Sequence, residues 1–171
     1  MVIDTSALLA IFLAEPERKP YLDLIFQAGK RLISAANVLE TGIVLETRRG
    51  ESAGREFDLF VVRTNLEIIP VDAEQIEIAR SAWRSFGKGC HPAALNFGDC
   101  FAYALARASG EPILAKGQDF ALTDIELCTQ TERTNPTALA VPLAATESNP
   151  ADTSSTAGPQ CQFLPMPFEI L

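Results

Sequence analysis

Short apolar runs alternate with stretches of helical periodicity along most of this sequence. Runs of strand type lie at 1–4, 31–34, 66–71 and 112–115, and residues at helical spacing fill the segments between them. Strands that alternate with helices form parallel sheets with helices packed on both faces. We therefore predict an α/β fold with a short central parallel sheet flanked by helices, and we expect a further short strand at 123–127.

The alternation ends near Leu127, and the remaining residues differ in composition. Residues 149–160 are rich in Ser, Thr, Pro and Gly, and apolar residues dominate again only at 163–171. A segment with few apolar residues cannot bury enough surface to offset the entropy lost on ordering its chain. We predict one folded domain over residues 1–127 and a disordered, low-complexity C-terminal extension over 128–171.

Charge and hydropathy narrow the functional classes. The formal net charge of −8 argues against a protein that binds nucleic acid through a broad basic surface. It does not exclude a nuclease, because a divalent metal held by carboxylates reverses the local charge. No apolar run reaches the roughly 18 to 20 residues of a membrane span, and the amino end lacks the basic residues of a secretory signal. We expect a cytoplasmic protein without membrane association.

Four carboxylates stand where the predicted elements would bring them to one edge of the sheet. Asp4 and Asp119 follow predicted strands, whereas Glu40 and Asp99 lie near the beginnings of predicted helices. Ligands of open α/β sheets bind beyond the carboxyl ends of the strands. Several carboxylates cannot stay ionised together without a cation, and oxygen ligands suit Mg²⁺ or Mn²⁺. The sequence therefore predicts a site for a hard divalent metal.

Each of these carboxylates also has a purely structural interpretation. Asp4 could cap the helix that follows it, and Asp99 could stabilise the first turn of its own helix. Glu40 lies on a largely apolar helix face, where a buried ion pair with an arginine would also satisfy it. Asp119 could be an ordinary turn residue. The metal hypothesis depends on all of them converging.

Four segments resemble the PIN-domain ribonucleases and, among these, the VapC toxins of bacterial toxin–antitoxin pairs. They are residues 2–8 (VIDTSAL), the helix around Glu40, residues 95–100 (LNFGDC) and residues 114–120 (LAKGQDF). Their order and approximate spacing match the family over residues 1 to about 126. The resemblance implies a PIN fold and metal-dependent endonucleolytic cleavage of RNA.

The resemblance also implies a site and partners. It assigns the catalytic, metal-binding carboxylates to Asp4, Glu40, Asp99 and, as the more variable member, Asp119. The expected cofactor is Mg²⁺, with Mn²⁺ as a substitute, and Ser6 or Thr5 would steady the site by hydrogen bonding. The expected partners are the RNA substrate, a cognate VapB-type antitoxin that occludes the site, and a second copy in a homodimer. The long segment after Leu127 departs from the family pattern.

Two other functions stay open. An aspartate-nucleophile phosphatase also has an Asp after its first strand, but such enzymes have a second acid two positions later, where this chain has Ser6. A non-catalytic PIN-like interaction module would keep the fold and lose the cleavage. Metal-dependent ribonuclease activity separates the proposed enzyme from that module.

Overall fold

The computed structural model describes residues 1–128, which contain four short strands and six α-helices. The strands are β1 (Val2–Ile3), β2 (Leu32–Ser34), β3 (Glu67–Ile69) and β4 (Ile113–Leu114). They form one sheet in the order β3-β2-β1-β4, and every pair is parallel. The predicted α/β fold with a short parallel sheet is confirmed.

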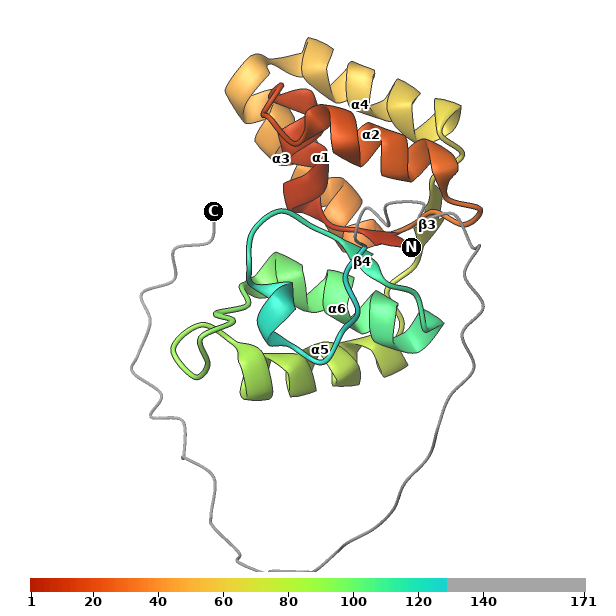
Figure 1. The fold of residues 1–171 in the computed structure, drawn as a ribbon. Helices are drawn as coiled ribbons and strands as arrows, with labels where there is room; N and C mark the ends of the chain where they lie inside the picture. The colour runs from red at the N-terminus through yellow and green to blue at the C-terminus, as the bar shows by residue number, and fades with distance from the viewer. Residues whose placement is uncertain (129–171) are drawn as a thin grey trace, which may run out of the picture. The chain divides into compact units, whose positions relative to one another are not determined.

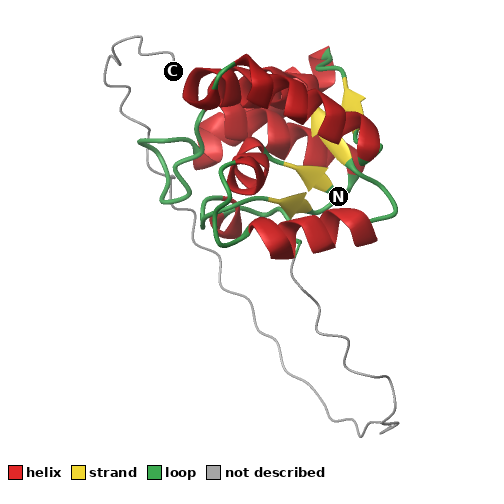
Figure 2. Cartoon of the chain, turned by 90° about the horizontal axis from the view of Figure 1, so that it is seen from above, coloured by secondary structure: helices red, strands yellow, loops and turns green. Residues whose placement is uncertain are grey.

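Helices cover both faces of this sheet. They are α1 (Thr5–Phe12), α2 (Arg18–Gln27), α3 (Ala35–Arg49), α4 (Glu51–Arg63), α5 (Ala73–Phe86) and α6 (Phe97–Ser109). Helices α1 to α4 lie on one side of the strands and α5 and α6 on the other (Figure 1). The view in Figure 2 shows the strands enclosed between the helices. None of the helices in residues 1–128 combines the length and hydropathy needed to span a bilayer.

The strand residues divide between two hydrophobic cores. One core, with α5 and α6, includes Val2, Leu32 and Ile113, and the other, with α1 to α4, includes Ile3, Ile33 and Leu114. Successive side chains of a strand point to opposite faces of the sheet. Because both faces are buried, β1 and β4 are apolar at both of their positions, and β2 is apolar except for the buried Ser34 at its end.

The strand predicted at 123–127 is not formed in the described part of the chain. A short 3₁₀ helix, Phe120–Leu122, precedes it, and Leu127 makes only a single parallel bridge with Ile113. Phe120 is buried in the core beside α6, and the Thr123 hydroxyl donates a 2.7 Å hydrogen bond back to the Phe120 carbonyl. These contacts turn the chain where a strand would extend it. The predicted extension over 128–171 lies outside the described residues except for Cys128, so it and the domain boundary remain predictions.

The strand order places the ends of β1 and β4 side by side. From β1 the chain goes to β2 and β3 on one side, then returns to β4 on the other side of β1. The loops that leave two such neighbouring strands diverge, and the crevice between them is where ligands bind in open α/β sheets. Asp4 directly follows β1, and the segment that contains Asp119 follows β4.

Candidate functional site

Asp4 is a buried carboxylate at the carboxyl end of β1. Its Oδ2 caps α1 by accepting hydrogen bonds from the Ser6 amide, at 2.8 Å, and from the Ser6 hydroxyl, at 2.6 Å. Its Oδ1 is buried as well and has no hydrogen-bond partner within residues 1–128. Burial raises the pKa of Asp4, and the bonds from Ser6 oppose this shift. A bare, buried carboxylate oxygen is costly unless a cation binds there.

Glu40, on α3, is held by neutral polar groups. The Thr5 hydroxyl donates a 2.6 Å hydrogen bond to Glu40 Oε2, and Asn37 Nδ2 lies 3.3 Å from the same oxygen. No ion pair within residues 1–128 involves Glu40, so the alternative of a buried arginine partner is not found there. The helix face is also less buried than its sequence suggests, because Ile43 is 40% exposed. Glu40 itself is half-buried.

Asn37 connects three helices beneath the site. Its side chain is fully buried, and Nδ2 lies 3.1 Å from the Thr5 hydroxyl and 3.1 Å from the Gly98 carbonyl. These contacts join α3 to the first turns of α1 and α6. Asn37 was missed among the predicted site residues, although its position one helical turn before Glu40 was a usable signal.

Asp99 forms a reciprocal capping box at the start of α6. Asn96 Oδ1 accepts a 2.9 Å hydrogen bond from the Asp99 amide, and Asp99 Oδ2 accepts a 2.7 Å bond from the Asn96 amide. Burial, together with the smaller effects of the charges of Asp4, Asp119 and Glu40, raises the pKa of Asp99 to about 7, and the Asn96 bond opposes this shift. Asp99 therefore has the expected capping role, and it also shares one electrostatic environment with the other three carboxylates.

Asp119 is the outermost of the four. It is exposed, and its side chain makes no capping bond at the 3₁₀ helix that begins beside it. It interacts electrostatically with the site, because its charge contributes to the raised pKa of Asp99. Asp119 is thus positioned to act from the open side of the site.

Ser6 joins the two loops that border the crevice. Its hydroxyl donates to Asp4 Oδ2 and accepts a 2.9 Å hydrogen bond from the Lys116 amide, in the loop after β4. The Lys116 side chain turns to Glu15 and Glu17, at 2.5 and 3.3 Å. Ser6 therefore fixes both the orientation of Asp4 and the spacing of the loops.

Gly98 is a further site residue that was missed from the sequence. A Cβ atom at this position would lie 2.7 Å from the carboxyl carbon of Glu40, so any other residue here would push the Glu40 side chain aside. Glycine thus allows the start of α6 to approach α3, because it has no Cβ. The available signal was its place directly before Asp99, at the beginning of a predicted helix.

The oxygen atoms of these side chains suit a hard divalent cation, although they do not enclose a complete coordination shell. In residues 1–128 no three His, Cys, Asp or Glu side chains are gathered closely enough to form a complete metal site. Mg²⁺ commonly binds one or two carboxylates, keeps several waters and takes the remaining oxygens from substrate phosphates. The all-oxygen donors and the bare Oδ1 of Asp4 fit such an ion.

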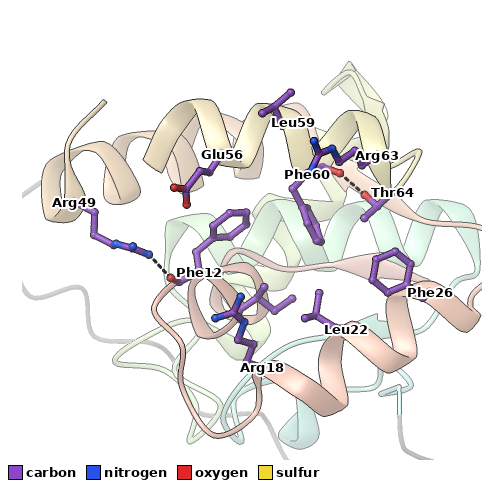
Figure 3. Close-up of a pocket in the computed structure, with 11 residues that line it drawn as sticks. Phe12, Arg18, Leu22, Phe26, Arg49, Glu56, Leu59, Phe60, Arg63 and Thr64 are labelled. Atoms are coloured by element: carbon purple, nitrogen blue, oxygen red, sulfur yellow. Dashed lines mark hydrogen bonds between the residues drawn. The ribbon is translucent and has the colours of Figure 1, made fainter. Parts of the chain in front are cut away.

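A separate groove lies between α1, α2 and α4, and none of the four carboxylates lines it (Figure 3). It encloses about 480 Å³. Its apolar lining consists of Ile11, Phe12, Leu22, Phe26, Leu59 and Phe60, and its polar lining of Arg18, Arg49, Glu56, Arg63 and Thr64. Arg49 is fixed by a 2.6 Å hydrogen bond to the Phe12 carbonyl. The molecule therefore has an acidic site and a distinct apolar groove edged by arginines.

Comparisons with known proteins agree with this architecture. Ribonuclease VapC of Mycolicibacterium smegmatis is 50% identical over 125 residues, which cover 73% of this chain and 97% of that protein. Ribonuclease VapC30 of Mycobacterium tuberculosis is 49% identical over 125 residues, 73% of this chain and 95% of that protein.

Solved structures share the fold at lower identity. The crystal structure of Mycobacterium tuberculosis VapC20, described as a sarcin-ricin loop cleaving toxin, has a TM-score of 0.61 at 20% identity and covers 72% of this chain and 95% of its own. VapBC2 from Rickettsia felis, bound to a promoter DNA fragment, has a TM-score of 0.59 at 15% identity, covering 74% of this chain and 95% of its own.

A family model described as the PIN domain matches residues 1–126, which span all four strands and all six helices. Together with the identity to the curated relatives, this match shows that the chain belongs to the PIN domain family.

Proposed function

We propose that this chain is a divalent-metal-dependent endoribonuclease and the toxin of a VapBC-type toxin–antitoxin pair. The observation that supports the proposal is the electrostatic influence of Asp4, Glu40 and Asp99 on one another near the end of β1, together with the bare, buried Oδ1 of Asp4. The relatives named ribonuclease VapC support the reaction class.

The roles of the residues follow from their environments. Asp4, Glu40 and Asp99 would hold Mg²⁺ or Mn²⁺ directly or through water, and Asp119 would contribute from the exposed side. When bound, such a cation lowers the pKa of a water ligand and offsets the negative charge that develops on the phosphoryl oxygens. The chain's own polar residues keep the donors oriented: Ser6 holds Asp4, Thr5 and Asn37 hold Glu40, and Asn96 holds Asp99.

Cleavage of RNA by the purified protein tests this proposal. We expect a mixed panel of tRNA, rRNA and mRNA to be cut at discrete sites with Mg²⁺ or Mn²⁺, and to stay intact with EDTA or with Asp99→Asn. A folded, metal-loaded protein that cuts none of these RNAs would favour the non-catalytic interaction module.

We further propose that a VapB-type antitoxin binds the groove between α1, α2 and α4. Phe26 and Leu59 leave 63% and 53% of their surfaces in water there, which a partner's apolar side chains would cover. Arg18, Arg49 and Arg63 outnumber Glu56 in the lining, so the fitting segment is apolar with acidic residues beside its anchors. Phe26→Ala should weaken antitoxin binding at least tenfold, by calorimetry, and leave RNA cleavage by the free toxin unchanged. Equal affinities would exclude this groove.

The homodimer expected for such toxins is also a proposal. Sedimentation equilibrium of the purified protein tests it through the measured mass. A monomer at all concentrations of the assay would contradict it.

A further inference from the structure

Phe97 leaves a large aromatic surface in water at the start of α6, next to Gly98 in the chain. It is 78% exposed, the highest value among the exposed large hydrophobic residues that the structure describes. A phenyl ring in solvent contributes little to folding, because hydrophobic stabilisation comes from surface removed from water. Its ring is nevertheless held in place, since Phe101 packs edge-on against it with ring centroids 4.9 Å apart. Phe97 thus presents a supported aromatic surface that the fold itself does not use.

Its position is fixed relative to the site. Phe97 is the first residue of α6, inside the capping box of Asn96 and Asp99 that defines the start of this helix. Gly98, the next residue, lies against the Glu40 carboxylate. Since consecutive Cα atoms are about 3.8 Å apart, the Phe97 backbone lies within about 8 Å of that carboxylate. A nucleotide whose phosphate is held at the carboxylates can therefore place a neighbouring base at this ring.

The negative charge of the chain makes an uncharged contact with RNA, such as base stacking, important for binding. With a net charge of −8, the protein has little general attraction for the RNA backbone. The lysine that follows β4, Lys116, is already paired with Glu15 and Glu17. Aromatic rings bind unpaired bases by stacking, which does not depend on protein charge.

We propose that Phe97 is a substrate-binding residue on which an unpaired base beside the scissile phosphate stacks. The proposal rests on the ribonuclease function above and requires that the base which meets Phe97 be unpaired, because a base within a duplex cannot leave its stack to meet the ring.

An apolar contact with a second copy of the chain is the competing explanation. Leu39 and Ile43, on the neighbouring helix α3, are 66% and 40% exposed. A protein interface needs apolar volume, whereas base stacking needs a flat π-system. Leucine and tryptophan at position 97 separate these requirements.

The experiment compares Phe97→Leu, Phe97→Trp and the control Val62→Ala, which alters a similarly exposed apolar residue on α4. The readouts are kcat and KM on an RNA that the wild type cuts, the fluorescence of 2-aminopurine in a random-sequence 12-nucleotide RNA, and the mass by sedimentation. We expect Phe97→Leu to raise KM by about 5-fold to 100-fold, with a small change in kcat, and to lose the 2-aminopurine quenching. Phe97→Trp and Val62→Ala should stay within about threefold of the wild-type KM.

Two results would overturn the proposal. One is a Phe97→Leu protein with wild-type KM and quenching. The other is an oligomer that dissociates in Phe97→Trp together with a loss of cleavage, which would assign the ring to an interface between copies. A wild type that quenches 2-aminopurine without cutting RNA would instead reject the ribonuclease function and keep the stacking surface.

Discussion

The hydroxyl of Thr5 donates a 2.6 Å hydrogen bond to the carboxylate of Glu40. The bond joins the first residue of α1 to α3. Together with the bonds from Ser6 to Asp4, it shows that two consecutive residues after β1 each orient a different carboxylate of the site.

Thr5→Val should impair cleavage without unfolding the protein. Valine has nearly the same shape but cannot donate, so Glu40 loses its orienting bond, and loss of such supporting bonds typically costs about 10-fold to 100-fold in metal affinity or activity. Thr5→Ser keeps the hydroxyl and should retain most of the activity. The measurement is kcat/KM as a function of Mg²⁺ concentration; equal values for valine and serine would show that the bond is unimportant.

Gly98→Ala should lower cleavage at least about tenfold, because the new methyl group collides with the Glu40 carboxyl group. The matched control is Gly42→Ala on α3, where a Cβ meets nothing within 4 Å. That control should raise the free energy of unfolding by about 0.5–1 kcal/mol through helix propensity and leave cleavage unchanged. Full activity of Gly98→Ala would contradict the close approach of α6 to α3.

Asp99→Asn should reduce cleavage by about 100-fold or more, since metal binding supplies several kcal/mol of transition-state stabilisation. The amide can still accept at the capping position, so the circular dichroism spectrum should match that of the wild type. Retained activity in this variant would remove Asp99 from the metal site.

The stability of the metal-free protein should fall between about pH 4 and pH 7. The pKa of Asp99 is raised by burial to about 7, whereas an unfolded Asp titrates near 3.9. The folded state therefore holds a proton that the unfolded chain has released in this window, so the free energy of unfolding decreases as pH rises. Denaturant titrations with EDTA should show this slope, and Asp99→Asn should flatten it.

Divalent metal should restore the stability that the metal-free protein loses as the pH rises to 7 and above. The ion binds the ionised carboxylates of the folded state, and a ligand at about 100 times its Kd adds about 2.7 kcal/mol. Thermal melts at pH 8 with Mg²⁺, Mn²⁺ or EDTA measure the effect. A melting temperature that is the same with Mg²⁺, Mn²⁺ and EDTA would count against the metal site.

Truncation after Gln130 should leave cleavage intact. The backbone amide of Cys128 donates a 2.8 Å hydrogen bond to the Ile113 carbonyl, so a cut at Glu126 would remove part of the sheet edge. A cut after Gln130 keeps all of the residues that the structure describes. The comparison is the specific activity of the truncated and full-length proteins on one RNA. A folded but inactive truncation would show that the following residues take part in the reaction.

The sequence determined the elements and the approximate place of the site. The apolar residues Val2 and Ile3 predict a buried strand, which ends at Asp4. Asn96 and Asp99 have the spacing of a capping box at the start of a helix. These signals are local, because strand burial and helix capping depend on residues a few positions apart. The same local reasoning was wrong for the strand at 123–127, where the burial of Phe120 turns the chain.

Only the tertiary structure decided which groups meet. The passage of α6 over α3 makes Gly98 a neighbour of Glu40, buries Asn37 between three helices and leaves Asp119 exposed. The packing also leaves Asp4 Oδ1 buried without a hydrogen-bond partner in the described chain, and it raises the pKa of Asp99. Such properties depend on distances between segments remote in the sequence, which the packing of the two cores sets and which no local pattern of residues encodes.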